Sequence, residues 1–161
     1  MIRQCRAGDA QRICFIINKA AEAYGGVIPA DRYRQPYMPM DELAAEMERV
    51  AFLGYEIDGE LVGIMGMEPI KDVTLIRHAY VLPEHQRQGI ASELLGQIMP
   101  LVKAPVLLVG TWNDAAWAIS FYQKHGFRLL PDKDRLLEKY WDIPRRQIET
   151  SVVLGIDSMQ A

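Results

Sequence analysis

A short polar segment, residues 86–91 (QRQGIA), has the composition of an anion-binding turn. It follows an apolar run that ends at Pro83, and an amphipathic helical pattern begins directly after it. A helix N-terminus carries unpaired N–H groups and a partial positive charge, and both favour a phosphate or pyrophosphate. Gly89 would let the backbone approach such a ligand, Ala91 keeps the next position small, and Arg87 offers a countercharge. From these residues alone, anion binding and a plain strand-to-helix connection are equally favoured.

Other signatures of nucleotide or metal binding are absent from the sequence. No Gly-Lys-Ser/Thr follows the turn, so it is not a P-loop, and the dinucleotide pattern G-x-G-x-x-G is missing. The two cysteines, Cys5 and Cys14, form no CxxC motif, and the three histidines (His78, His85 and His125) lack metal-ligand spacing. The sequence therefore predicts no metal.

The composition of the 161-residue chain limits its function. Hydrophobic residues make up 50% of it, which is enough for one substantial core. The formal net charge of -3 is unlike that of a nucleic-acid-binding domain. The first residues contain no apolar signal region, and no apolar run approaches the length of a membrane span. We expect a cytoplasmic protein with neither a nucleic acid nor a membrane as partner.

The elements that would position these residues follow the order βααβββαβαβ. A strand at IRQC precedes a helix that begins near Asp9, and a second helix begins at Asp41, after an ordered, proline-rich loop over residues 27–40. AFLGYEI and ELVGIMGMEPI form a hairpin around Asp58 and Gly59, and VTLIRHAYVL is the third long strand. After the turn come a helix, the buried strand PVLLVGT, a second helix, a short helix or turn at DRLLEKYWDI and the closing strand IETSVVLGI. We expect a single domain over residues 1–161 of the α/β class, with a twisted mixed sheet flanked by helices.

Two blocks of the sequence resemble signatures of the GCN5-related N-acetyltransferase (GNAT) superfamily. QRQGIA is similar to its Gln/Arg-x-x-Gly-x-Gly/Ala motif, and AYVLPEH is similar to the strand and proline that precede that motif. AISFYQKHGF resembles the second signature, A-x-x-F-Y-x-x-x-G-F, at a fitting spacing. The resemblance implies the GNAT fold, with acetyl-CoA as the acyl donor.

The resemblance also implies roles for single residues. In such proteins the pantetheine arm of acetyl-CoA lies between two splayed parallel strands and pairs with the backbone of one of them, here Tyr80, Val81 and Leu82. The N–H groups that would hold the pyrophosphate are those of Arg87, Gln88, Gly89, Ile90, Ala91 and Ser92. Tyr122 matches the family tyrosine that protonates the departing thiolate, although it could instead only fill the core. The asparagine that many members carry seven residues earlier is replaced by Ala115.

An amine acceptor is protonated at neutral pH, so its acetylation needs a base or a water chain. Glu68, at the end of a strand in GMEPI, is the first candidate, with neighbouring glycines that could mark a bulge and aim it into the cleft. The alternative is a solvent-facing carboxylate at a strand end. His78 is a second candidate because imidazole changes its charge near neutral pH. Its position on one strand face with Ile76 and Tyr80 favours a buried sheet histidine instead.

The loop over residues 24–40 occupies the place of the acceptor-binding segment in this family. Its tyrosines and charged residues could recognise a substrate or simply pack the loop, and Trp112 and Trp117 could line the same cleft or fill the core. The tail over residues 134–154 could also reach the acceptor side, and its final strand is a candidate edge for a homodimer. The acceptor stays open between a small amine, an amino acid, an antibiotic and a protein N-terminus or lysine. The compact chain favours a small-molecule amine.

Two functions follow as hypotheses. The first is an acetyl-CoA-dependent N-acetyltransferase that acts by direct attack of the amine, with the oxyanion bound by a backbone N–H near Val81. No covalent enzyme intermediate is expected, because neither cysteine lies in a recognisable nucleophile setting. The alternative is a non-catalytic module that binds CoA or an acyl-CoA as a sensor or partner-dependent subunit. The presence of Tyr122 favours the enzyme.

Overall fold

The structure is a computed structural model, and it describes residues 1–158. Its strands are β1 (Ile2–Gln4), β2 (Ala51–Ile57), β3 (Glu60–Ile70), β4 (Val73–Val81), β5 (Val106–Trp112), β6 (Arg128–Leu129) and β7 (Ser151–Asp157). Its α-helices are α1 (Ala10–Ala21), α2 (Met40–Glu46), α3 (Ile90–Ile98), α4 (Ala116–Lys124), α5 (Lys133–Tyr140) and α6 (Arg145–Glu149). The expected elements are present, but the closing strand begins at Ser151, because Ile148 and Glu149 belong to α6. The additional elements β6 and α6 are too short for their periodicity to show in the sequence.

The seven strands form one sheet in the order β1-β2-β3-β4-β5-β7-β6. Every neighbouring pair is antiparallel except β4 and β5, which are parallel. The mixed sheet flanked by helices that the sequence predicts is therefore confirmed. The proposed dimer edge needs a correction, because β7 lies inside the sheet, between β5 and β6.

Local residue chemistry explains several element boundaries. Asp58 and Gly59 have φ of 51° and 82°, the positive values that a two-residue hairpin turn requires, and they join β2 to β3 as predicted. The helix α2 begins at Met40 behind Pro39, slightly before the expected start at Asp41. Asp9 precedes α1 but does not cap it, because its carboxylate accepts hydrogen bonds from Arg3 and from the backbone N–H of Arg6.

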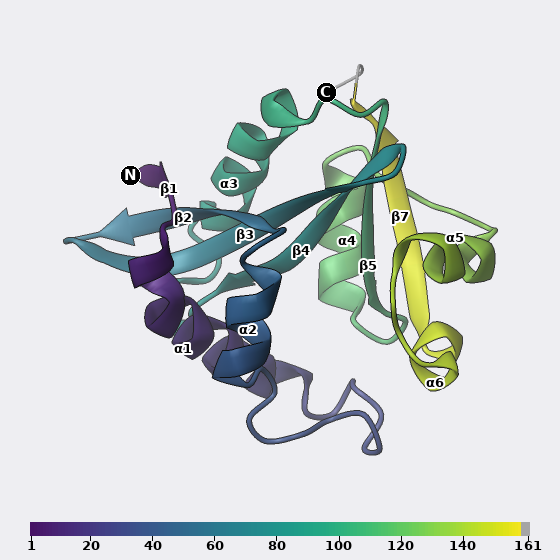
Figure 1. Ribbon diagram of the computed structural model, residues 1–161, viewed down its shortest axis with the longest axis horizontal. Helices are drawn as coiled ribbons and strands as arrows, with labels where there is room; N and C mark the ends of the chain where they lie inside the picture. Colours follow the sequence, from purple (N-terminus) through teal and green to yellow (C-terminus); the bar gives the residue numbers. More distant parts are fainter. Residues whose placement is uncertain (159–161) are drawn as a thin grey trace.

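Helices cover both faces of the sheet. Figure 1 shows α1 and α2 below the half that contains β1 to β4, and α3 on the opposite side. The apolar face of α3 is buried in the core, as its spacing predicts, through Ile90, Leu94, Leu95 and Ile98. The helix α5 packs against β7. Within residues 1–158, no helix is long and apolar enough to cross a membrane.

The parallel strands β4 and β5 separate along their length. They pair only from Val73 with Val106 to Ile76 with Val109. Beyond that point β4 continues to Val81 and β5 to Trp112 without pairing, and the two strands diverge (Figure 1). The sheet therefore opens into a gap between the C-terminal ends of two neighbouring strands.

A β-bulge in β4 lies at this gap. Ile64 of β3 pairs with Tyr80 and Gly66 pairs with Arg77, so that Met65 alone faces two residues of β4. One of these two is His78, whose φ is 55°. The bulge corrects the expectation that His78 shares a face with Ile76 and Tyr80, because Arg77 and His78 both direct their side chains toward Glu46 of α2.

Candidate active site

The predicted anion-binding turn has an open helix N-terminus. Gly89 occupies the N-cap position of α3 with φ of 81°, and no side chain caps the helix. The first backbone hydrogen bond of α3 runs from Glu93 N–H to Gly89 O at 3.0 Å, so the preceding N–H groups have no acceptor within the helix. A Cβ atom built on Gly89 would meet no atom within 4 Å. The turn therefore offers free donors and free space, and both fit a bound phosphate.

Side chains and backbone hold this turn next to β4. The amide of Gln86 donates to Val81 O at 3.1 Å, and Leu82 N–H donates to Val62 O of β3 at 2.9 Å. The backbone N–H and C=O groups of successive strand residues point alternately to the two edges of the strand. Those of Leu82 therefore face β3, and those of Val81 face the gap. On the other side of the turn, Ser92 Oγ lies 3.0 Å from Nε2 of His125 at the end of α4. Of the three predicted backbone contacts, Val81 has the clearest access to the gap.

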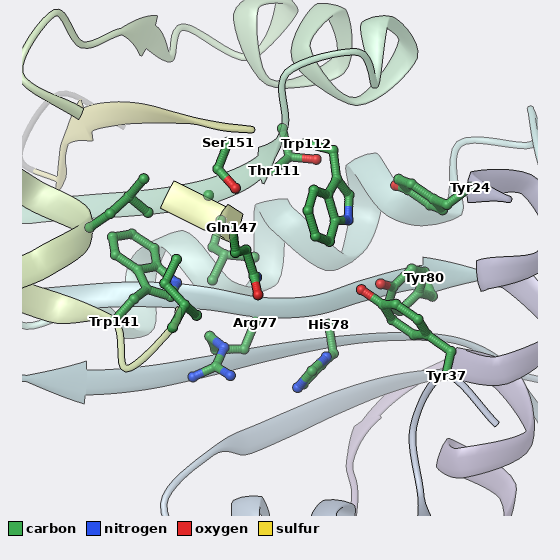
Figure 2. A pocket seen from close by; sticks show the side chains of 14 residues that line it. Tyr24, Tyr37, Arg77, His78, Tyr80, Thr111, Trp112, Trp141, Gln147 and Ser151 are labelled. Carbon is green, nitrogen blue, oxygen red and sulfur yellow. The ribbon is translucent and has the colours of Figure 1, made fainter. Parts of the chain in front are cut away.

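A cavity of about 160 Å³ lies where β4 and β5 diverge. Figure 2 shows it between the two strands, with tyrosines from the N-terminal half on one side and residues from the C-terminal tail on the other. The lining residues are Tyr24, Tyr37, Ile76, Arg77, His78, Tyr80, Gly110, Thr111, Trp112, Leu137, Trp141, Ile143, Gln147 and Ser151. The sequence suggested that the tail could reach this side, and Trp141 and Gln147 do so.

A network of phenol and indole groups crosses the gap. Tyr37, from the loop over residues 27–39, accepts hydrogen bonds from the hydroxyl of Tyr80 on β4 and the indole N–H of Trp112 on β5. Burial raises the pKa of Tyr37 despite these two hydrogen bonds, and burial also raises the pKa of Tyr80. Both phenols therefore stay neutral at physiological pH. The network ties the loop to the two strands that form the cavity.

The loop itself is anchored on both sides. Asn18 of α1 forms two hydrogen bonds with the backbone of Met38, at 2.7 and 3.0 Å. Asp31 lies 3.3 Å from Arg146 of α6, so the loop also reaches the C-terminal wall of the cavity. The ring of Tyr33 stacks on Tyr37 with 6.1 Å between centroids. Tyr33 thus packs the loop, whereas Tyr24 and Tyr37 line the cavity.

Trp117 and the charged loop residue Arg34 are not among the residues that line the cavity. Trp117 contacts Tyr24 at 4.9 Å between ring centroids but is itself 48% exposed. Arg34 forms an ion pair with Glu42 of α2. Of the two tryptophans beside the second signature, only Trp112 lines the cavity.

Charged side chains from α2, the turn after it, β3 and β4 form a cluster behind the cavity, in which the two glutamates are buried and Arg49 is exposed. Arg77 donates to Glu68 Oε1 at 2.7 Å and to Glu46 Oε1 at 2.9 Å, and Arg49 donates to Glu68 Oε2 at 3.2 Å. His78 Nε2 lies 2.8 Å from the same Oε1 of Glu46. Burial alone would raise the pKa of Glu46, but the hydrogen bond to His78 and the neighbouring cationic groups lower it overall. Glu46 is therefore ionised at neutral pH.

The structure places Glu68, the first candidate for the base, inside this cluster. Its side chain is 7% exposed, and each of its two oxygens accepts a hydrogen bond from an arginine. Glu68 is not among the residues that line the cavity. Glu46, which the sequence analysis did not single out, contacts the second candidate, His78. No local signal could have revealed that contact, because the two residues are 32 positions apart.

Tyr122 is buried on the inner face of α4. It is 5% exposed and packs against Phe121 and Phe127, with ring centroids 5.1 and 5.3 Å away. Burial raises the pKa of its phenol, so the group keeps its proton at neutral pH. Ala115, at the position where many relatives carry an asparagine, is fully buried at the N-cap of α4. The catalytic role of Tyr122 stays a prediction, because Tyr122 does not line the cavity described above.

Comparisons with known proteins agree with this architecture. The N-acetyltransferase PaiA of Thermoplasma acidophilum, solved in complex with coenzyme A, has a TM-score of 0.75 at 17% identity, over 98% of each chain. A GNAT family acetyltransferase of Elizabethkingia anophelis with acetyl-CoA bound has a TM-score of 0.64 at 22% identity, over 98% of this chain and 97% of the other. The ribosomal-protein-S18-alanine N-acetyltransferase of Escherichia coli has a TM-score of 0.71 at 15% identity, over 98% of this chain and 92% of the other. These likenesses show a shared fold.

The sequence itself matches a family model. The model of the acetyltransferase (GNAT) domain covers residues 48–129, which is half of the chain. The matched segment runs from just before β2 to the end of β6, and it contains the open turn before α3, the bulged strand β4 and Tyr122. The chain therefore belongs to the GNAT acetyltransferase family.

Proposed function

We propose that the protein is an N-acetyltransferase that transfers the acetyl group of acetyl-CoA to the amine of a small molecule by direct attack. The observation that carries this proposal is the uncapped N-terminus of α3 at the open end of the gap between β4 and β5. The turn would hold the pyrophosphate, and the gap between the unpaired ends of β4 and β5 would hold the pantetheine arm. A phosphorylated ligand with a long arm, such as acetyl-CoA, fits both parts.

The residues that would hold acetyl-CoA follow from this arrangement. The backbone N–H groups from Arg87 to Ser92 surround the open N-terminus, and Val81 faces the gap in which the pantetheine arm would lie. Two of the solved structures with the same fold carry coenzyme A or acetyl-CoA. Acetyl-CoA is a co-substrate here, and no metal is part of the proposal: within residues 1–158, no group of three side chains could hold a metal ion.

The lining of the cavity supports an acceptor with one amine and an apolar body. Its walls include the rings of Tyr24, Trp112 and Trp141, and none of the lining side chains is a carboxylate. Arg77 is charged but is already neutralised by two glutamates. A polyamine would place further ammonium groups in this cavity without an anionic partner, which costs desolvation free energy. An arylalkyl monoamine would instead bury its ring against the aromatic walls.

The cysteines support direct attack without a covalent enzyme intermediate. Burial raises the pKa of Cys5 to about 11, and burial also raises the pKa of Cys14. A thiol must ionise to act as a nucleophile, so neither residue is suited to that role at neutral pH. Neither cysteine lines the cavity between β4 and β5. Tyr122, which keeps its proton, is the proposed acid for the departing thiolate.

Calorimetry and an amine panel test the proposal. Titration with acetyl-CoA, with CoA as control, should give micromolar affinity, on the order of 8 kcal/mol of binding free energy. Release of CoA thiol should then be faster with 2-phenylethylamine than with spermidine or a peptide that begins with alanine. Absence of acetyl-CoA binding would contradict the proposed function. Binding without thiol release from any amine would favour the non-catalytic CoA-binding module, and preference for the peptide would favour a protein acceptor.

A further inference from the structure

The bulge places His78 in a backbone conformation that is uncommon for residues other than glycine. Its φ of 55° lies in the left-handed region, where a side chain with a Cβ is strained. Strained residues of this kind persist where the surrounding structure imposes them, and they cluster at catalytic and binding positions. His78 also lines the cavity proposed for the acceptor. Among the residues that line this cavity, only His78 has a positive φ, which makes it a candidate for a functional role.

One ring nitrogen of His78 is occupied and the other is available. Nε2 lies 2.8 Å from Oε1 of Glu46, whose side chain is 8% exposed and also accepts a hydrogen bond from Arg77. Because an ionised carboxylate can only accept, the neutral imidazole must carry its hydrogen on Nε2. The lone pair is then on Nδ1. Within residues 1–158, no hydrogen bond engages Nδ1, so this atom is able to accept a proton.

The charges around His78 allow it to take up that proton. The titratable and charged groups that face it come from α2, β3, β4 and the adjoining loops: Tyr37, Glu46, Arg49, Glu68, Arg77 and Tyr80. Two carboxylates and two guanidinium groups balance each other while His78 is neutral. When His78 becomes an imidazolium, the carboxylate of Glu46 is already in hydrogen-bond contact and stabilises it. Glu68 is less suited to accept a proton, because each of its oxygens already accepts a hydrogen bond from an arginine.

We infer, on the basis of the acetyl transfer proposed above, that His78 is the catalytic base of this protein and that Glu46 positions it. Nδ1 takes one proton from the acceptor ammonium, directly or through one water, and releases it to solvent. The neutral nitrogen then forms the C–N bond with the thioester carbonyl carbon, and the C–S bond breaks with its electron pair going to sulfur. The second nitrogen proton reaches the sulfur by way of Tyr122, which leaves an amide and the CoA thiol.

Two acceptors of similar shape and different basicity test the role of His78. 2-Phenylethylamine is protonated at pH 7 and needs a base, whereas O-benzylhydroxylamine is already neutral. In His78→Asn, a residue that tolerates the left-handed region, kcat/KM for 2-phenylethylamine should fall by about 100-fold. The loss with O-benzylhydroxylamine should be only about twofold, because no proton has to be removed before attack. The affinity for acetyl-CoA, measured by calorimetry, should not change.

The pH profile separates a base from a structural residue. The wild-type rate should fall as the pH drops, because a protonated His78 cannot accept a second proton, and His78→Asn should lack this limb. Glu46→Gln should lower kcat/KM for 2-phenylethylamine, because the imidazole loses the carboxylate that holds its Nε2. Glu48→Gln is the matched control, because this exposed glutamate lies two residues away and outside the cluster. It should leave the rate and the profile unchanged.

Each of the following results would overturn the inference. Equal losses with the two acceptors would mean a structural role, and an unchanged rate in His78→Asn would exclude His78 as the base. If the wild-type protein acetylates neither compound, the same comparison is made on the slow hydrolysis of acetyl-CoA, in which water must be deprotonated; equal hydrolysis by both proteins then excludes the role. A wild-type protein that does not bind acetyl-CoA would refute the proposed function and this inference together. If the wild-type protein binds acetyl-CoA and turns over, and His78→Asn is as active as the wild type, only the inference about His78 is refuted.

Discussion

At the scale of residues, the hydrogen-bond partners decide which side chains are able to react. Glu68 and His78 lie near each other in the sheet, and both have a group that can accept a proton. Arg49 and Arg77 hold both oxygens of Glu68, which stabilises its charged form and occupies its lone pairs. His78 has a carboxylate on one ring nitrogen and no described partner on the other. Tyr122, the proposed acid, keeps its proton at neutral pH because burial raises the pKa of its phenol.

Substitution of Tyr122 tests its role as the acid. In Tyr122→Phe, kcat should fall by roughly 10- to 100-fold, because the thiolate loses its proton donor, while the affinity for acetyl-CoA changes little. Steady-state thiol release and calorimetry measure the two quantities. Tyr140→Phe is the matched control, since its hydroxyl donates to Asp72 at 2.6 Å, away from the cavity lining. An unchanged kcat in Tyr122→Phe would assign this tyrosine to the core alone.

At the scale of elements, the turn before α3 combines an unusual backbone conformation with an open helix end. Arg87 and Gly89 both have positive φ, at 64° and 81°, and these values bring the chain from β4 into α3. Only glycine adopts this region without strain. The absence of a side chain at Gly89 also leaves the first N–H groups of the helix accessible. Gly89 thus allows the chain to turn from β4 into α3 and also keeps the proposed phosphate site open.

Substitution of Gly89 tests the phosphate site. Gly89→Val should weaken acetyl-CoA binding by tenfold or more, because its side chain would cover the free N–H groups and shift the turn; tenfold is about 1.4 kcal/mol. The left-handed φ should cost about 1–2 kcal/mol of stability. Gly96→Ala, in an exposed position of the same helix, should raise stability by about 0.5–1 kcal/mol and leave binding unchanged. Calorimetry and urea unfolding measure both effects. Normal binding by Gly89→Val would contradict the phosphate site.

At the scale of the whole molecule, long-range contacts close the fold around the cavity. Arg3 of β1 forms ion pairs with Asp9, just before α1, and with Glu56 of β2. These contacts fix the first strand and the first helix to the edge of the sheet. At the other end of the sequence, α5 and α6 bring Trp141 and Gln147 to the cavity (Figure 2). The C-terminal helices therefore form part of the cavity wall, whereas the N-terminal ion pairs hold the edge of the sheet.

The contact between Arg3 and Asp9 predicts a dependence of stability on pH. The hydrogen bonds from Arg3 lower the pKa of Asp9 from 3.8 to about 2. A carboxyl with a lowered pKa in the folded state stabilises the protein above its unfolded pKa, and this contribution is lost as the pH falls toward 2. Asp9→Asn should therefore lower the free energy of unfolding by about 1–2 kcal/mol at pH 7, after allowance for solvent screening. At pH 2 the variant and the wild type should be nearly equal.

Urea unfolding at pH 7 and at pH 2 measures this difference. Asp134→Asn serves as the control, because its carboxylate is 55% exposed and pairs only with its neighbour Lys133, at 3.3 Å. Such exposed pairs contribute little to stability, so this variant should unfold like the wild type at both pH values. A difference for Asp9→Asn that is the same at pH 2 and pH 7 would contradict the role of the ion pair.

The sequence by itself determined the features that depend on neighbouring residues. The hairpin turn at Asp58 and Gly59, the glycine turn before α3 and the buried strand β5 all follow from local residue types and their spacing. The order of the long elements was predictable for the same reason, since a helix and a strand bury their apolar side chains at different periods. The two GNAT signatures lie within these local segments.

Only the tertiary structure decided which polar groups meet. Three contacts join segments that are far apart in the sequence. They are the contact of His78 with Glu46, the ion pairs of Glu68 with two arginines, and the hydrogen bond from Tyr80 to Tyr37. The bulge that turns His78 toward Glu46 depends on the register of two strands, which periodicity does not determine to one residue. Reactive groups depend on partners brought together by folding, whereas helices, strands and turns depend mainly on adjacent residues.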